Sequence, residues 1–443
     1  MNVLFVTSEV HPFAQTGGLA DVSAALPKAL CTENVSTRVI IPLYGSIAPE
    51  WREQMSFIKY IYIPLAWRNV YCGLFELEKD GVIYYFIDNE YYFKRSDIYG
   101  HYDECERFAF FSRAVAALLC EFDGWIPDII HCNDWQTALV PVYMRQLYEG
   151  VSEYEAMRTV FTIHNIEYQG RHEKDILGHV LGLPDDLFYN GGAIEYMGDI
   201  SLMKGAILMS DWITTVSPTY AKELQYSFYA HGLEGVLAAN KHKLTGILNG
   251  IDMEQFNPET QPDNMAFSAK DFSGRANCKA ELQKLLCLDR RPDVPLIVMI
   301  GRLAGHKGID LVNTALDDIM ALDVQFAVLG RGDWHYEQLL TDASRRYEGR
   351  FSASILYSQP LAQSMYSGGD IFLMPSRAEP CGLAQMLSMR YGNVPVVRKT
   401  GGLCDTVLPY SKDTKKGSGF VFDNYAADDM LGSLKQAIYI YRN

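Results

Sequence analysis

The sequence predicts an α/β protein made of two doubly wound, Rossmann-like domains that face each other across a central cleft. Short runs rich in Val, Ile and Phe alternate with amphipathic stretches, and this alternation occurs in two separate series. Each series also contains a Thr-Gly-Gly-Leu-x-Asp string, at residues 16–21 and 400–405, between an expected strand and an expected helix. The boundary falls near residues 240–255, which gives domains of residues 1–245 and 246–443.

In the first series, dense hydrophobic runs predict strands that are covered on both faces. These runs are residues 3–7, 38–41, 129–131, 159–164 and 212–216. After the first strand, large hydrophobic residues recur at spacings of three and four and predict a helix: they are Leu19, Val22, Leu26 and Leu30. The aromatic segment 57–87 alternates in polarity and contains Lys-Asp-Gly at 79–81, which predicts an antiparallel hairpin.

In the second series, the expected strands are residues 296–300, 325–329, 354–357, 371–374 and 394–397, with helical patterns between them. The polar segment 257–271 contains two prolines and predicts a loop. The last helical pattern, residues 428–441, ends just before the chain does.

Composition excludes several classes of protein. With 54 acidic and 39 basic residues the formal charge is −15, which disfavours a nucleic-acid-binding surface. Nine irregularly spaced cysteines do not form a disulfide framework, and no run is apolar enough to span a membrane. The start lacks the features of a secretory signal peptide. We therefore expect a cytoplasmic protein, or a plastid protein if the source is a plant whose transit peptide has been removed.

Motifs for common cofactors are missing from the sequence. There is no Asp-x-Asp and no His/carboxylate cluster with ligand spacing, so no metal is expected to hold a diphosphate. Gly-x-x-x-x-Gly-Lys-Ser/Thr and Gly-x-Gly-x-x-Gly are also missing, which disfavours P-loop ATPases and dinucleotide-binding enzymes.

The loop that precedes the first helix, residues 15–21, is the first candidate binding element. Its two glycines let a ligand approach the backbone closely, and the start of the helix offers unpaired N–H groups to an anion. A simple tight turn is the alternative.

Arg302 and Lys307 form a second candidate, in a glycine-rich loop directly after a hydrophobic strand. A guanidinium fork and a point charge together suit a diphosphate. Two solvated basic residues are the alternative.

Three further residues follow expected strands, where ligands bind in open α/β sheets. A carboxylate at Glu379 could accept sugar hydroxyls or stabilise positive charge at an anomeric carbon. It could equally stabilise the start of the next helix. His164 and Asp134 end two strands of the first series and could meet a sugar, or could be ordinary structural groups.

Taken in order, these strings resemble the bacterial glycogen synthase and plant starch synthase family of retaining glucosyltransferases. The matching strings are VTSE (6–9), TGGLADV (16–22), NDWQT (133–137), TIHN (162–165), LNGID (248–252), GRL (301–303) with KG (307–308), PSR (375–377) with EPCGL (379–383), and TGGL (400–403). They run nearly the whole length of the chain. The resemblance implies the GT-B architecture and transfer of glucose from ADP-glucose to the non-reducing-end 4-OH of an α-1,4-glucan, with retention. Glycogen and maltooligosaccharides are the implied acceptors.

The resemblance also implies roles for individual residues. Arg302 and Lys307 would neutralise the departing diphosphate, Glu379 would lie near the transferred glucose, and His164 would contact that glucose. Gly18 would give backbone N–H contacts to the phosphates. The remaining substrate-binding positions expected from the resemblance are Gln15, Gly17, Asp21, Asp134, Asn249, Tyr357, Cys381, Gly382, Leu383, Thr400 and Gly401. No cofactor is implied, and the oligomeric state stays open.

Two departures from the family pattern leave rival functions open. Gln15 replaces the family's usual lysine, and the chain ends where family members normally continue into a final crossover helix. One rival is a catalytically impaired glucan-binding or regulatory relative. The other is a GT-B glycosyltransferase that uses a different nucleotide sugar, whereas nothing signals the lysine of a pyridoxal-phosphate phosphorylase.

Overall fold

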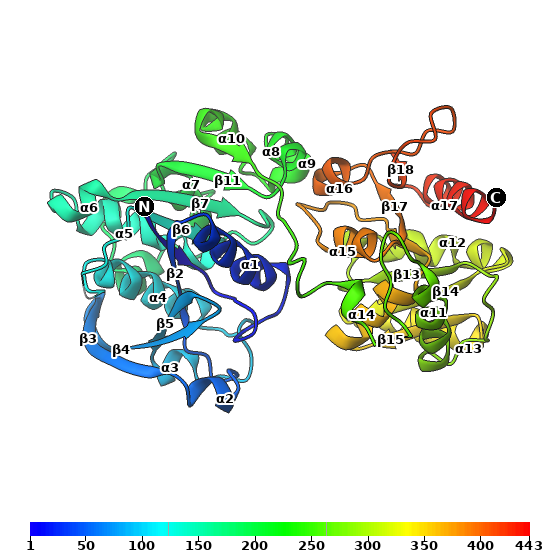
Figure 1. Ribbon diagram of the computed structural model, residues 1–443. Coiled ribbons are helices and arrows are strands. Elements are labelled where there is room, and N and C mark those ends of the chain that lie inside the picture. The colour runs from blue at the N-terminus through cyan, green and yellow to red at the C-terminus, as the bar shows by residue number, and fades with distance from the viewer. Residues whose placement is uncertain (123, 263) are drawn as a thin grey trace. The chain divides into compact units, whose positions relative to one another are not determined.

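The chain forms two compact units in the computed structural model, Met1–Gly250 and Ile251–Asn443 (Figure 1). The structure describes residues 1–122, 124–262 and 264–443. Each unit is built around its own sheet.

Within its described residues, the first unit contains a nine-stranded sheet in the order β12-β11-β7-β6-β1-β2-β5-β4-β3. The strands are β1 Asn2–Val6, β2 Ser36–Pro42, β3 Ser56–Leu65, β4 Arg68–Lys79, β5 Val82–Asp88, β6 Ile129–Asn133, β7 Arg158–Ile163, β11 Trp212–Thr215 and β12 Leu244–Gly246. All neighbours are parallel except β3/β4 and β4/β5, which are antiparallel. The five strands expected in this unit are therefore confirmed as β1, β2, β6, β7 and β11.

Helices and short elements complete the first unit. The helices are α1 Gly18–Thr32, α2 Pro49–Arg52, α3 Glu90–Phe93, α4 Glu104–Leu118, α5 Leu139–Leu147, α6 Ser152–Ala156, α7 Leu202–Met209, α8 Pro218–Glu223, α9 Ser227–Ala230 and α10 Glu234–Ala239. A small sheet pairs β10 Asp199–Ser201 with β8 Arg171–His172 and β9 Glu195–Tyr196. Single helical turns are η1 Trp135–Thr137, η2 Leu177–Leu181, η3 Asp185–Leu187 and η4 Lys241–Lys243.

The predicted antiparallel hairpin in the aromatic segment is confirmed as β4 and β5, and β3 joins it as a third antiparallel strand. Asp80 and Gly81 connect β4 to β5 with φ angles of 53° and 76°, and Lys79 pairs with Val82. Positive φ at both central residues is what a two-residue hairpin turn requires. β3 adds a further antiparallel strand and ends the sheet.

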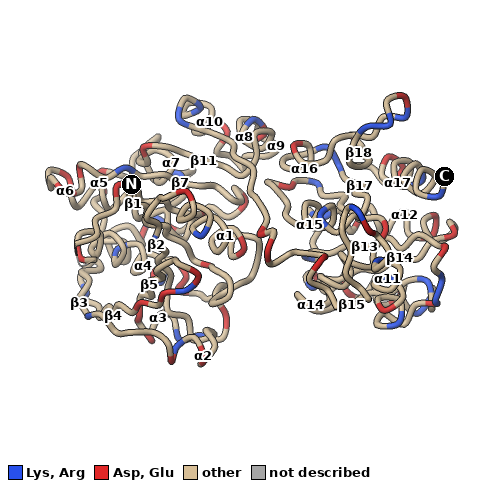
Figure 2. The backbone as a smooth tube through the Cα atoms, in the orientation of Figure 1, with Lys and Arg blue, Asp and Glu red and all other residues tan. Residues whose placement is uncertain are grey.

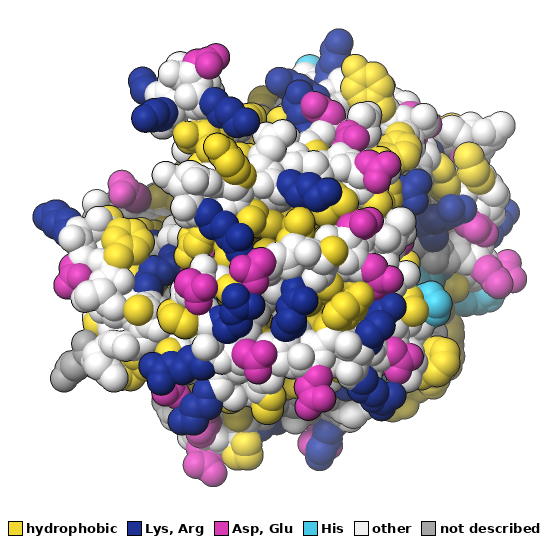
Figure 3. Space-filling model, turned by 90° about the vertical axis from the view of Figure 1, so that its right-hand side faces the viewer, with side chains coloured by type: hydrophobic (Ala, Val, Ile, Leu, Met, Phe, Trp, Pro, Cys, Tyr) yellow, Lys and Arg dark blue, Asp and Glu magenta, His cyan; other side chains and the backbone are white. Residues whose placement is uncertain are grey.

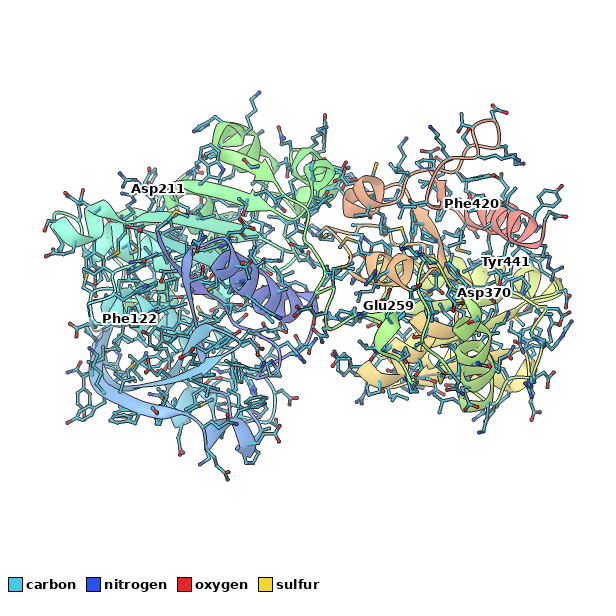
Figure 4. The ribbon with its side chains drawn as sticks, viewed as in Figure 1. Phe122, Asp211, Glu259, Asp370, Phe420 and Tyr441 are labelled. Atoms are coloured by element: carbon cyan, nitrogen blue, oxygen red, sulfur yellow. The ribbon has the colours of Figure 1, made fainter. Side chains whose placement is uncertain are left out.

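Side chains also link neighbouring strands. Asp211, just before β11, accepts hydrogen bonds from the backbone N and Oγ1 of Thr159 in β7, both at 2.8 Å (Figure 4). Arg145 of α5 donates to the other oxygen of Asp211 at 2.7 Å. These contacts fix the register of β7 against β11.

The second unit contains a six-stranded parallel sheet in the order β15-β14-β13-β16-β17-β18, counted over its described residues. The strands are β13 Leu296–Ile300, β14 Gln325–Gly330, β15 Phe351–Ile355, β16 Ile371–Met374, β17 Val394–Arg398 and β18 Phe420–Phe422. The helices are α11 Ser273–Leu285, α12 Ile309–Ala321, α13 Trp334–Arg346, α14 Gln359–Gly368, α15 Ala384–Arg390, α16 Gly401–Thr406 and α17 Ala427–Arg442, with turns η5 Pro258–Thr260 and η6 Gly305–Lys307.

One expected strand in this unit is displaced. The strand predicted at 354–357 begins at Phe351 and ends at Ile355, because Phe351 is buried against Phe326 of β14 with ring centroids 5.3 Å apart. Tyr357 therefore lies beyond the strand. The segment 257–271 is a loop with one short turn, as expected, apart from residue 263, which lies outside the described residues.

Both faces of the second sheet are buried, which is the defining property of a doubly wound fold. In β13, Ile297 and Met299 belong to one hydrophobic cluster, and Leu296 and Val298 belong to another. The first cluster is completed by α12, α13 and α17, the second by α11, α14, α15 and α16. Alternate residues of one strand thus face opposite helical layers.

The last helix is anchored to the amino end of β16. Tyr441 of α17 donates its hydroxyl to Asp370 Oδ1 at 2.6 Å, and Lys279 of α11 donates to Asp370 Oδ2 at the same distance (Figure 4). Asp370 and Lys279 are both buried, so three elements meet at one ion pair.

Charges of both signs are interspersed along the chain (Figure 2) and on the face that Figure 3 shows. Over the described residues, none of the helices combines the length and the apolar character that crossing a membrane would demand.

Candidate active site

In the first unit, candidate residues follow three adjacent strands. β1 lies between β6 and β2 in the sheet. The chain adds β2 on one side of β1 and later adds β6 on the other side, so the strand order reverses at β1. At such a switch point the loops separate and leave room for a ligand at the carboxyl ends of the strands. The segments that follow β1, β6 and β7 carry Gln15–Asp21, Asp134 and His164 in turn, and α1 begins at Gly18 within the first of them.

Glu9 holds the loop that leads into α1. Its Oε2 accepts hydrogen bonds from the backbone N of Thr16 at 2.5 Å and of Gly17 at 3.1 Å. Its Oε1 accepts from Thr16 Oγ1 at 2.7 Å and from the Tyr99 hydroxyl at 2.8 Å. Glu9 is only 4% exposed, so these four donors compensate a buried carboxylate. Glu9 was not predicted as a site residue from the sequence, although its position just after an expected strand could have indicated one.

Gly17 and Gly18 are exposed at the start of α1. Gly17 is extended, with φ −158°, a conformation open to any residue, and a Cβ there would meet no atom within 4 Å. Neither backbone conformation nor packing in the chain therefore demands glycine at this position. Open space beside the first N–H groups of a 15-residue helix suits the close approach of an anion.

Gln15 is engaged at both ends of its amide. Nε2 donates to Asp21 Oδ1 at 3.1 Å, and Oε1 lies 3.0 Å from His11 Nδ1. Burial raises the pKa of Asp21 to about 6, with His11 and the Gln15 hydrogen bond acting in the opposite direction. Gln15 therefore bridges the Asp21 carboxylate and the His11 ring by hydrogen bonds and brings no charge of its own.

Asp134 and His164 lie side by side at the ends of β6 and β7. Asp134 Oδ1 accepts from the backbone N of His164 at 2.7 Å and of Asn165 at 3.3 Å. Asp134 has a φ of 56°, a left-handed conformation that is costly for a non-glycine residue and recurs at functional sites. Burial raises the pKa of Asp134 to about 7 despite these two hydrogen bonds.

The hydrogen bonds around His164 assign its tautomer. Burial lowers the pKa of His164 to about 3, so the ring is neutral at pH 7. Asn133 donates its Nδ2 to the carbonyl oxygens of Val6 and His131, which leaves Asn133 Oδ1 to accept from His164 Nε2 at 2.9 Å. The proton thus resides on Nε2, and Nδ1 is an acceptor.

In the second unit, Lys307 and Glu379 meet at the corresponding switch point. β13 lies between β14 and β16, and the loops that follow β13 and β16 carry the two residues. Lys307 Nζ donates to Glu379 Oε2 at 2.6 Å, and Ser376 Oγ donates to the same oxygen at 3.0 Å. The Glu379 side chain is 7% exposed and that of Lys307 is 23% exposed.

The second Thr-Gly-Gly-Leu string packs against the Glu379 loop. A Cβ on Gly401 would lie 1.9 Å from the carbonyl oxygen of Glu379, and one on Gly402 would lie 2.2 Å from that of Cys381. Gly401 also has a φ of 43°. The backbone N of Gly402 donates to the carbonyl oxygens of Glu379 and Pro380, both at 3.1 Å. Unlike Gly17 in the first unit, these glycines are required by packing.

The remaining predicted residues occupy several places. Arg302 is exposed in the loop after β13, and Tyr357 is 68% exposed in the loop after β15. Asn249 is half-buried, three residues after β12 and next to the end of the first unit. The others belong to the Glu379 loop and the start of α16, where Cys381 and Thr400 are buried, Leu383 is half-buried and Gly382 has a φ of 72°.

No group of three or more His, Cys, Asp or Glu side chains suited to a metal ion occurs among the residues that the structure describes.

Comparison with known proteins decides the family. The family model for the starch synthase catalytic domain matches residues 2–239, and that for group 1 glycosyl transferases matches residues 288–439. The chain belongs to the glycogen and starch synthase family. Glycogen synthases from Desulforamulus reducens and Geobacillus stearothermophilus are each 48% identical to it over 443 residues, covering all of this chain and 92% and 91% of theirs.

Solved structures agree with this assignment. The catalytic domain of starch synthase IV from Arabidopsis thaliana, bound to ADP and acarbose, superposes with a TM-score of 0.93 at 33% identity and covers all of this chain and 92% of that one. Sucrose-phosphate synthase from Thermosynechococcus elongatus, at 15% identity and a TM-score of 0.64, shares the fold. This family member is thus a glycosyltransferase with the GT-B fold.

Proposed function

We propose that this enzyme transfers glucose from ADP-glucose to the non-reducing-end 4-OH of an α-1,4-glucan with retention of configuration. The contact between Lys307 and Glu379 is the observation that carries the proposal, because it places a cation and a buried carboxylate together at the carboxyl edge of a parallel sheet. The glycogen synthases it resembles and the ADP and acarbose bound to the Arabidopsis enzyme support the choice of substrates.

The proposed chemistry is stabilisation of the leaving group by fixed cations. Arg302 and Lys307 would supply the positive charge that meets the diphosphate. When the donor binds, Lys307 is shared between Glu379 and the leaving phosphate, which favours departure of ADP. We propose no metal or other cofactor in this step.

The proposed roles in the first unit follow from hydrogen-bonding capacity. The backbone N–H of Gly18 would contact the phosphates of the donor, because the N–H of Gly17 already donates to Glu9. The neutral His164 ring offers an acceptor at Nδ1, which suits a sugar hydroxyl. Asp134 holds the backbone N of His164 and thereby fixes the carbonyl that would face the anomeric centre. Asp21 would accept further hydroxyls.

The test is incorporation of labelled glucose into glycogen by the purified full chain, with ADP-glucose and UDP-glucose as parallel donors. We expect incorporation from ADP-glucose. Incorporation from UDP-glucose alone would replace the proposed donor. No incorporation from either donor, together with intact glycogen binding, would favour the impaired glucan-binding relative.

A further inference from the structure

β3 and β4 lie at the outer edge of the first unit's sheet (Figure 1). Exposed aromatic side chains lie on one face of this strand pair. We call this set the aromatic platform: Phe57, Tyr60, Tyr62, Tyr71 and Phe75. Four of its members are 53%, 59%, 58% and 38% exposed in that order, and Phe75 is half-buried. Ring centroids lie 5.3 Å apart for Phe57–Phe75, 6.0 Å for Tyr60–Tyr71 and 6.1 Å for Tyr60–Tyr62. The rings therefore form two contact groups on the same face: Phe57 with Phe75, and Tyr60 with Tyr62 and Tyr71.

The register of the two strands creates this surface. Phe57 pairs with Phe75, Tyr62 pairs with Tyr71, and Tyr60 pairs with Gly73. Because Gly73 has no side chain, the Tyr71 ring lies across it: a Cβ at Gly73 would be 2.7 Å from the Tyr71 hydroxyl. Tyr60 then stacks on Tyr71 with an interplanar angle of 26°. Gly73 thus leaves the space in which the Tyr71 ring stacks on Tyr60.

Charges near the aromatic platform disfavour an anionic ligand. Lys59 of β3 is paired with Glu121 at 2.7 Å. Arg68 and Lys79, at the two ends of β4, are paired with Glu106 and Asp80 respectively. Each nearby cation is thus balanced by a carboxylate. A neutral ligand with apolar faces and hydroxyl groups, such as a sugar chain, matches stacked tyrosine rings and their phenolic hydroxyls.

The edge strand also resists pairing with a second copy of this chain. A β-bulge interrupts β3 between Phe57 and Lys59, and Pro64 lacks the N–H that a further strand would need. A bulge, a proline and a lysine are the usual devices that protect a sheet edge from another strand. The exposed aromatic face is therefore better suited to a carbohydrate than to self-association.

We propose that the aromatic platform is a second binding site for α-1,4-glucan, and the identity of that polymer rests on the proposed function. β3 lies four strands from β1, or about 19 Å at the usual strand spacing, so the aromatic platform is separate from the site at Glu9 and Gly17. A polymer held at one site is presented to the other at a high effective concentration. The aromatic platform should therefore favour long acceptors over short ones.

The experiment uses the full chain with Tyr60 and Tyr62 both replaced by threonine, a residue that favours strands. Tyr439→Thr, at a side chain 61% exposed on α17, is the matched control. Glycogen affinity is measured by retardation in native gels that contain glycogen. We expect the double variant to bind glycogen about tenfold more weakly, with the control unchanged. With ADP-glucose as donor, KM for glycogen should rise, while kcat and KM for maltotriose should stay within about twofold.

Unchanged glycogen affinity in a folded double variant would overturn the proposal. A dimer that appears for the natural chain in sedimentation and is lost in the double variant would also overturn it, in favour of self-association. If the double variant does not fold, hydrogen exchange of the natural chain replaces it: glycogen should slow exchange over residues 56–79, and equal rates would overturn the proposal. If the natural chain binds glycogen but transfers no glucose, loss of that binding in the double variant would support the aromatic platform while refuting the proposed function.

Discussion

Lys307 and Glu379 are 72 residues apart in the chain, and their side chains lie 2.6 Å from each other. The contact exists because β13 and β16 are neighbours at the switch point of the second sheet, so the loops that follow them meet. Gly308 tightens the contact, since a Cβ there would be 2.3 Å from the carbonyl oxygen of Pro375. The position of Lys307 beside Glu379 thus depends on close backbone packing between these two loops.

Replacing Glu379 by alanine is expected to lower kcat by at least about 100-fold and to change the Kd for ADP by less than about threefold. The carboxylate is proposed to face the transferred glucose, whereas ADP itself would contact the cations. Initial rates and calorimetric titration with ADP provide the two values. Equal losses in kcat and ADP affinity would contradict this role.

Replacing Glu9 by alanine is expected to lower the free energy of unfolding by about 2–4 kcal/mol, because four donors lose a buried charged acceptor. Glu9→Gln keeps one oxygen for the two backbone N–H groups and should recover part of that loss. Urea unfolding gives the stability, and KM for ADP-glucose reports on the Gly17 loop. Glu33→Gln, at an exposed position, is the control and should change neither value.

The pH dependence of stability should separate Asp134 from His164. Asp134 has a folded pKa of about 7, above its ordinary value of 3.8, so its contribution falls as pH rises from about 4 to about 7. His164 has a folded pKa of about 3, below its ordinary value of 6.5, so its contribution rises as pH rises from about 3 to about 6.5. The two slopes oppose each other over most of this range.

Substitution should therefore expose one slope at a time. Relative to the natural chain, Asp134→Asn should gain stability as pH rises from 4 to 7, and His164→Asn should lose stability as pH rises from 4 to 6.5. Urea unfolding at intervals of half a pH unit measures both differences. Parallel curves for all three proteins would contradict the assigned pKa shifts.

Replacing Gln15 by lysine is expected to lower the pKa of Asp21, because an ammonium group would replace a neutral amide beside it. It should also lower KM for ADP-glucose several-fold at low salt, and the gain should shrink at high salt. Measurements at two ionic strengths test both effects. An unchanged KM at low salt would show that a charge at position 15 does not reach the donor.

Replacing Tyr441 by phenylalanine is expected to destabilise the chain by about 1–2 kcal/mol, because a buried carboxylate loses one donor. Activity should be unaffected at temperatures where the variant is folded. Tyr439→Phe, on the same helix but exposed, is the control for the loss of a hydroxyl. A variant as stable as the natural chain in urea would contradict the anchoring role of Asp370.

Hydrophobic runs predicted the central strands because parallel strands buried on both faces need continuous apolar sequence. The prediction at 354–357 was wrong because tertiary packing of Phe351 sets where β15 begins. β18 was missed because its three residues carry too little pattern. Lys307 and Glu379 were both identified from sequence, but their contact depends on strand order. Glu9 was missed because its role depends on how the loop to α1 folds back onto it, which brings Thr16 and Gly17 to the carboxylate.

The two Thr-Gly-Gly-Leu strings are identical in sequence, but the space around their first glycines differs. A methyl group added at Gly17 meets no neighbour in the ligand-free chain, whereas one added at Gly401 collides with the carbonyl of Glu379. Alanine at 17 should consequently be invisible to folding assays and appear only when substrate is present. Alanine at 401 should reduce the yield of folded protein before any substrate is added. A substitution at position 17 therefore tests contact with the substrate, whereas one at position 401 tests packing of the folded chain.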